Sequence, residues 1–261
     1  MIRNSLGMTR NTLNKNPKDM LIFALDTGSH IEEAISWVDR LKEHVGSFKI
    51  GKESFTFHGP GIVRRVKAKG CRVFLDLKFH DIPKTVAAAA VAAVKLGVDM
   101  FNIHAVGGGE MMESAVVSTR WAAQQSNLPM PLVLAVTVLT SLNDDDLKTM
   151  GFHRSASDLT LDLAKIAQDA GVGGVVASAH DVEGIRKACG RNFVIVTPGI
   201  RGKEMAGDDQ KRIWSARDAA ASGADYVVVG RPIRTADDPV NRADEIVREI
   251  AEGLAIIEKD G

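Results

Sequence analysis

The stretch Val73-Phe-Leu-Asp-Leu-Lys-Phe-His-Asp-Ile-Pro-Lys-Thr85 predicts a buried strand that leads into a helix. Its first half is almost continuously apolar, which is typical of a parallel strand covered on both faces. Asp76 and Lys78 interrupt this run, and because side chains alternate along a strand, both are expected on the same face. Asp81 follows, and Pro83 suits the first turn of a helix. Two carboxylates and an ammonium group are therefore expected together at one strand end.

These charged residues have a structural and a functional interpretation. Asp81 can be the N-cap of a helix that begins near Ile82, and Asp76 with Lys78 can form a structural ion pair. Against this, burying a charge costs several kcal/mol, and well-packed apolar residues often stabilise a fold as much. Charges kept at such a place favour a functional interpretation.

Short apolar runs alternate with longer amphipathic segments on both sides of this stretch. The runs predict strands at 21–26, 48–51, 73–78, 100–104, 132–138, 174–178, 193–198 and 226–230. The amphipathic segments predict helices at 31–45, 53–69, 82–96, 110–125, 158–170, 181–188, 214–221 and 244–257. This alternation predicts an α/β protein, a single-domain (β/α)₈ TIM barrel over residues 20–261, in preference to an open sheet.

Residues 1–19 precede the regular pattern and are basic and polar, with no acidic residue before Asp19. A targeting peptide would need an apolar central segment, and this stretch has none. We expect residues 1–19 to be a flexible N-terminal arm.

The overall charge is balanced, with 33 Lys and Arg against 33 Asp and Glu. No global field therefore favours nucleic acid or an anionic membrane, and an anionic substrate would have to be bound locally. Cys71 and Cys189 match no metal or redox spacing, and two isolated thiols fit a reducing cytoplasm. No apolar run reaches the length that spans a membrane.

The barrel interpretation gathers polar residues at one rim, the carboxyl ends of the strands, where active sites of this architecture form. Asp26 ends the first predicted strand and Lys49 lies in the second. His104 ends the fourth strand, and Thr140 follows the fifth. The predicted rim therefore carries several charged residues that are otherwise scarce in strands.

The segments after the last two strands are the frequent phosphate site of such barrels. Gly230 would allow close approach of an anion, and Arg231 offers a planar fork of donors, although a tight turn with a solvated arginine is the alternative. Residues 197–212 have neither helical nor strand periodicity, and a loop this long is typical of a lid or of disorder.

Seven motifs in order, over residues 20–257, resemble the orotidine 5′-phosphate decarboxylase family. They are A-L-D at 24–26, F-K-I-G at 48–51, D-L-K-F-H-D-I-P-K-T at 76–85, N-I-H-A at 102–105, A-V-T-V-L-T-S at 135–141, T-P-G-I-R at 197–201 and V-G-R-P-I at 229–233. G-D-D-Q at 207–210 is also similar to the family. The resemblance implies decarboxylation of orotidine 5′-phosphate to UMP, the last step of pyrimidine synthesis, without a cofactor or a metal.

The resemblance also implies roles for individual residues. Lys49, Asp76, Lys78 and Asp81 would form the catalytic network, with Lys78 as the proton donor. The implied substrate contacts are Asp26, Lys49, Ile82, Thr85, Thr140, Pro198, Arg201, Gln210, Gly230 and Arg231. Among these, Asp26 and Lys49 would bind ribose hydroxyls and Thr140 the pyrimidine, while Gln210, Gly230 and Arg231 would bind the phosphate.

The family further implies a homodimer, in which Asp81, Ile82 and Thr85 come from the neighbouring subunit. It assigns no chemical step to His104, for which we favour a structural, hydrogen-bonded role over a general base or a metal ligand. The glycines at 107–109 are interpreted as a turn before a helix.

Two alternatives remain open. The first is a metal-dependent branch, the 3-keto-gulonate 6-phosphate decarboxylases and hexulose-phosphate synthases, which has a carboxylate ligand in the second strand, where this chain has Lys49. The second is a non-catalytic nucleotide sensor on the same barrel.

Overall fold

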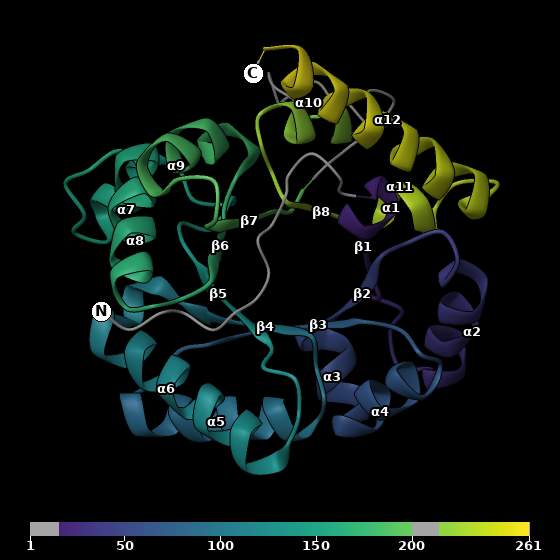
Figure 1. The fold of residues 1–261 in the computed structure, drawn as a ribbon, viewed down its shortest axis with the longest axis horizontal. Helices are drawn as coiled ribbons and strands as arrows, with labels where there is room; N and C mark the ends of the chain where they lie inside the picture. The colour runs from purple at the N-terminus through teal and green to yellow at the C-terminus, as the bar shows by residue number, and fades with distance from the viewer. Residues whose placement is uncertain (1–15, 200–213, 261) are drawn as a thin grey trace.

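The computed structural model describes residues 16–199 and 214–260, and these form a closed barrel of eight parallel strands ringed by helices (Figure 1). Each strand pairs with the next in the chain, and β8 pairs with β1 to close the barrel. The strands are β1 Leu21–Ala24, β2 Ser47–Gly51, β3 Val73–Phe79, β4 Met100–His104, β5 Leu132–Val136, β6 Gly174–Val176, β7 Val194–Thr197 and β8 Tyr226–Val229. The predicted single-domain TIM barrel is confirmed.

Most strands end one or two residues before their predicted ends. Val138, Ser178 and Pro198, for example, lie beyond the last paired residues of β5, β6 and β7. These residues already belong to the rim, where the chain turns toward the helices.

The principal helices follow the order of the predicted segments, with three differences. They are α2 Ile31–Leu41, α3 Lys52–His58, α4 Pro60–Ala68, α5 Pro83–Lys95, α6 Gly109–Ser126, α8 Ala156–Asp169, α9 Val182–Cys189, α10 Ala216–Ala221 and α12 Pro239–Asp260. The single helix predicted at 53–69 is wrong, because Gly59 has a φ of 56° and Pro60 begins a new helix. The first predicted helix also ends early, at Leu41 rather than residue 45, and the last one begins early, at Pro239 rather than residue 244.

Short helical segments that the periodicity did not predict lie in the connections. They are α1 Pro17–Met20, α7 Asp144–Thr149, α11 Arg231–Arg234, and the 3-10 turns Ala105–Gly107 and Ala179–Asp181. Residues 1–15 of the predicted arm lie outside the described residues. The last part of that segment packs on the barrel, since Asp19 forms an ion pair of 2.5 Å with Arg72.

The barrel encloses an apolar layer that supports a polar one. Alternate residues of seven strands form a cluster separate from the core between strands and helices: Ile22, Ala24, Phe74, Met100, Leu134, Val136, Val176, Val194, Val196 and Val228. Lys49, Asp76 and Asn102 continue this alternation on β2, β3 and β4 toward the carboxyl end. The interior below the rim is therefore packed with side chains, and its polar groups lie at the end where barrel active sites form.

In the two described ranges, 16–199 and 214–260, none of the helices combines the length and the apolar character needed to cross a bilayer.

Candidate active site

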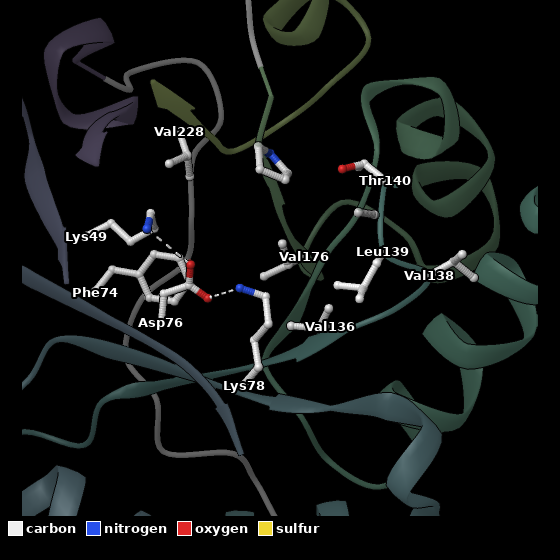
Figure 2. Close-up of a pocket in the computed structure, with 12 residues that line it drawn as sticks. Lys49, Phe74, Asp76, Lys78, Val136, Val138, Leu139, Thr140, Val176 and Val228 are labelled. Carbon is white, nitrogen blue, oxygen red and sulfur yellow. Dashed lines mark hydrogen bonds and ion pairs between the residues drawn. The ribbon is translucent and has the colours of Figure 1, made fainter. Parts of the chain in front are cut away.

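A pocket opens at the carboxyl end of the barrel, over the packed apolar layer (Figure 2). It encloses about 610 Å³, including the solvent at its mouth. The lining residues are Lys49, Phe74, Asp76, Lys78, Val136, Val138, Leu139, Thr140, Val176, Ala177, Pro198 and Val228. A mostly apolar cavity with a few convergent charges is the usual form of a small-molecule site.

Four charged side chains, three of which line the pocket, alternate in sign. The Lys49 ammonium lies 3.4 Å from Asp26 Oδ1 and 3.3 Å from Asp76 Oδ2. The Lys78 ammonium lies 2.6 Å from Asp76 Oδ1, as Figure 2 shows. We call Asp26, Lys49, Asp76 and Lys78 the charge row. The expected placement of Asp76 and Lys78 on one side of β3 is confirmed, and the row joins strands β2 and β3 to the segment after β1.

Asp76 is the most enclosed carboxylate of the charge row, with 13% of its side chain exposed. Burial acts to raise its pKa, but the charges of Lys49 and Lys78 and the hydrogen bonds from Lys78 and Asn102 outweigh burial. The pKa of Asp76 therefore lies below the ordinary value of an aspartic acid. The pocket contains a fixed negative charge at neutral pH, flanked by two ammonium groups.

Strand β3 is irregular where it carries these groups. It pairs with β4 at Leu75 and Phe101, and the pairing resumes at Phe79 and Ile103. Three residues of β3 therefore lie opposite Asn102 alone. Such bulges bend a strand and redirect its side chains, and they are frequent next to active sites.

Lys78 lies inside this bulge with a φ of 53°. A left-handed backbone costs roughly 1–2 kcal/mol for a residue with a side chain. The Lys78 backbone N–H donates to Asn102 Oδ1 at 2.7 Å, and Asn102 Nδ2 donates to Asp76 Oδ1 at 2.7 Å. The sequence did not indicate the role of Asn102, and the available signal was a polar side chain between the apolar Phe101 and Ile103 of the strand that carries N-I-H-A.

The structure does not add Asp81 to the charge row of its own chain. Asp81 is exposed after β3, and its Oδ1 accepts a hydrogen bond of 2.7 Å from the Ile82 backbone N–H. Ile82, itself 65% exposed, occupies the N-cap position of α5, so the interpretation of Asp81 as that N-cap is wrong. Thr85, in the first turn of α5, is exposed as well.

The remaining predicted substrate contacts lie partly in the described structure. Thr140 and Pro198 line the pocket, and Arg231 is exposed at the start of α11. Gly230 precedes α11, where an added Cβ would lie 3.1 Å from the Ala24 Cβ, so glycine lets this turn approach β1 closely. Arg201 and Gln210 lie outside the described residues.

Comparison with known proteins identifies the family. The model of the Orotidine 5'-phosphate decarboxylase / HUMPS family matches residues 19–246. The chain belongs to this family. It is 59% identical to the orotidine 5'-phosphate decarboxylase of Syntrophus aciditrophicus over 249 residues, which are 95% of this chain and 99% of that protein.

Two further relatives agree with this membership of the orotidine 5'-phosphate decarboxylase / HUMPS family. The chain is 49% identical to the orotidine 5'-phosphate decarboxylase of Syntrophotalea carbinolica over 90% of this chain and 96% of that protein. The crystal structure of orotidine 5'-phosphate decarboxylase from Lactobacillus acidophilus superposes with a TM-score of 0.78 at 34% identity, and the match covers 88% of this chain and 98% of that one.

The surroundings of His104 differ from those that its predicted role requires. Its Nδ1 is buried and has no hydrogen-bond partner among residues 16–199 and 214–260, so the expected hydrogen-bonded role is not found at this atom. The ring lies 5.4 Å from the ring of His80, centroid to centroid. Burial, together with the positive charges of His80, Lys78 and Lys52, lowers the pKa of His104 to about 4. His104 is therefore uncharged at neutral pH.

Replacing His104 with glutamine should flatten the pH dependence of stability. Because folding lowers the pKa from 6.5 to about 4, the unfolded chain binds this proton first as the pH falls. The neutral ring thus stabilises the fold above pH 6.5, and that contribution is lost toward pH 4. Urea unfolding at about pH 7 and about pH 5 should show that the parent loses about 1 kcal/mol more than His104→Gln, after allowance for partial exposure.

The exposed His153 supplies the control for this comparison. His153→Gln should retain the pH dependence of the parent protein. Parallel losses in the parent and in His104→Gln would contradict the prediction.

Proposed function

We propose that this chain converts orotidine 5′-phosphate to UMP and carbon dioxide, the last step of pyrimidine synthesis, in the cytoplasm and without a cofactor. The family membership supports the decarboxylase activity. The observation that carries the proposed mechanism is the charge row, which places the ammonium of Lys78 and the carboxylate of Asp76 together at a pocket with apolar walls.

The proposed reaction requires strong electrostatic stabilisation of its transition state. Breaking the bond from C6 to the carboxylate leaves the electron pair on C6, where no adjacent carbonyl can take it up as an enolate. Many decarboxylases use the electron sink of a bound cofactor for this purpose. Here the barrier would be lowered by fixed charges and positioning, which must supply about 20 kcal/mol.

Asp76 would act on the bound substrate before the bond breaks. Two unit charges about 4 Å apart repel by roughly 4 kcal/mol at an effective dielectric constant of 20. The substrate carboxylate held against Asp76 would lose this repulsion as carbon dioxide departs. The contribution is therefore useful but much smaller than the whole barrier.

Lys78 would supply the remaining chemistry at C6. Its ammonium group would stabilise the developing negative charge and then transfer a proton to C6, leaving a neutral amine that solvent reprotonates. The ion pair of 2.6 Å with Asp76 would hold the ammonium group in place for both steps. Lys49, 12% exposed and between two carboxylates, would fix Asp76 and bind a ribose hydroxyl together with Asp26.

The phosphate would provide binding energy away from the reacting carbon. Gly230 and Arg231 lie after β8, and Arg201 and Gln210 belong to the segment that the sequence predicts as a lid. Closure of that segment over the phosphate would exclude water, and the binding energy of the phosphate would then stabilise the transition state. Thr140 and Pro198, which line the pocket, would contact the base and the closing segment.

Replacing Arg231 with alanine should distinguish a phosphate clamp from a surface arginine. We expect kcat/KM for the phosphorylated substrate to fall by about 100-fold, because a charge-assisted contact to a phosphate is lost. The rate with the phosphate-free nucleoside should change little. Arg217→Ala, at an exposed arginine of α10, is the matched control. Equal losses on both substrates would argue against the clamp.

The proposed assembly is a homodimer with two shared sites. Asp81, Ile82 and Thr85 are exposed after the carboxyl end of β3, where a second chain can contact them. A symmetric dimer contact would deliver Asp81 of each chain to Lys78 of the other and extend the charge row by one carboxylate.

The deciding experiment follows the absorbance of orotidine 5′-phosphate with protein treated exhaustively with a chelator. Rapid conversion to UMP and carbon dioxide is expected. Conversion only with added magnesium would favour the metal-dependent sugar-phosphate branch, and nucleotide binding without conversion would favour a sensor. The position of Lys49 between Asp26 and Asp76 supports the first outcome, because an ammonium group there would repel a metal ion.

A further inference from the structure

Lys78 adopts a backbone conformation that its side chain disfavours. Its φ of 53° lies in the left-handed region, where glycine is favoured. Within the described ranges the other non-glycine residue with positive φ is Asn127, which ends α6 as a C-cap, a place where this conformation is common. Lys78 lies within β3 instead, so its conformation must be held by its surroundings.

Asn102 makes the contacts that hold it. The side chain is 0% exposed and faces the interrupted part of the β3–β4 pairing. Its Oδ1 accepts a hydrogen bond from the Lys78 backbone N–H, and its Nδ2 donates to Asp76 Oδ1, both at 2.7 Å. The same Asp76 oxygen accepts from Lys78 Nζ at 2.6 Å. Asn102 is thus bound to the backbone of one member of the charge row and to the carboxylate of another.

An amide satisfies both contacts at once, through two separate atoms. The Lys78 backbone N–H can only donate, and the Asp76 carboxylate can only accept, so the group between them must both accept and donate. A carboxylate at position 102 would repel Asp76. An alkyl side chain would leave two enclosed polar groups without these bonds.

We propose that Asn102 is a positioning residue of the active site, which fixes the left-handed backbone of Lys78 and the orientation of Asp76 so that their charged groups meet at the pocket. Asn102 is not among the residues that line the pocket, so it acts through the other two. This inference rests on the catalytic roles proposed above for Lys78 and Asp76 and deepens them.

Two substitutions separate the contributions of the amide. Asn102→Leu removes both hydrogen bonds at similar volume, and a misplacement of the reacting groups should reduce kcat by about 100-fold. KM should change by less than about threefold, because the phosphate and ribose contacts lie on other elements. Asn102→Asp keeps an acceptor for the Lys78 N–H but sets a second carboxylate beside Asp76.

The dependence of kcat on pH then gives a second test, because a purely structural role of Asn102 would leave this dependence unchanged. A neighbouring negative charge raises the pKa of Asp76. As the pH is lowered, the kcat of Asn102→Asp should therefore begin to fall at a higher pH than the kcat of the parent does. Asn102→Leu adds no charge, so the acid limb of its pH profile should be displaced less. UMP binding and thermal unfolding would be measured for every variant.

The controls assign each failure to its own cause. Thr119→Val removes a buried hydrogen bond of 2.7 Å to the Ala115 carbonyl on α6, remote from the pocket, and should leave kcat unchanged. If Asn102→Leu does not fold, the smaller Asn102→Ala, which also removes both contacts, takes its place. A folded variant with kcat within about twofold of the parent and an unshifted acid limb overturns the inference. An active Lys78→Ala protein would instead overturn the proposed mechanism, whatever the Asn102 variants do.

Discussion

Lys78→Ala should abolish turnover while the protein still binds UMP. The ammonium group is both the proposed proton donor and the positive charge nearest the developing carbanion, so its loss removes two contributions at once. We expect kcat to fall by at least about 10⁴-fold, the upper range for a general acid, with further loss from the missing electrostatic stabilisation. Single-turnover measurements with excess enzyme would detect any residual chemistry.

The product complex provides the internal check on this prediction. The UMP affinity of Lys78→Ala should stay within about tenfold of the parent, because UMP has no group at C6 for the ammonium to stabilise. Lys187→Ala, at an exposed lysine of α9, should behave as the parent does in both assays. Turnover by Lys78→Ala above about 1% of the parent rate would remove Lys78 from the proton-donor role.

Asp81→Asn should inactivate each homodimer, and activity should return when this variant shares a dimer with Lys78→Ala. Asparagine can still accept the hydrogen bond from the Ile82 backbone N–H, so the local structure is retained while the charge is lost. A mixed dimer has one site with both substitutions and one site with neither. Random pairing should therefore restore about one quarter of the parent activity.

Co-expression of the two variants with different affinity tags would isolate the mixed dimers. Each variant expressed alone is the control and should be inactive. Recovered activity would assign Asp81 to the site of the other chain. If the purified mixed dimer stays inactive, or if Asp81→Asn alone is active, the shared site is wrong.

The barrel was predictable because its parallel strands are short, apolar and separated by amphipathic helices. Features that depend on the backbone conformation of a single residue could not be predicted in the same way. The break at Gly59 was missed because the apolar positions keep helical spacing through it, and only the left-handed glycine followed by Pro60 ends one helix and begins another.

The charge row was predictable only in part, because its geometry also depends on the backbone of one residue, Lys78. Alternation along β3 was enough to place Asp76 and Lys78 together, although the strand reaches that arrangement through a bulge. The bulge depends on the pairing with β4, which a pattern within one strand does not report. Asn102 was missed because its importance arises only from that pairing. His104 was interpreted from its place at a strand end, whereas its lowered pKa follows first from its burial and then from the cations around it.

The charge row sums to zero, since two carboxylates alternate with two ammonium groups. Replacing Lys49 or Lys78 alone by a neutral residue leaves the enclosed Asp76 carboxylate with one ammonium group in place of two, which is less favourable for folding than loss of a matched pair. Replacing Asp76 and Lys78 together by neutral residues is therefore expected to destabilise the fold less than replacing Lys78 alone. The same neutrality that lets the barrel fold around these charges makes the two residues depend on each other for stability.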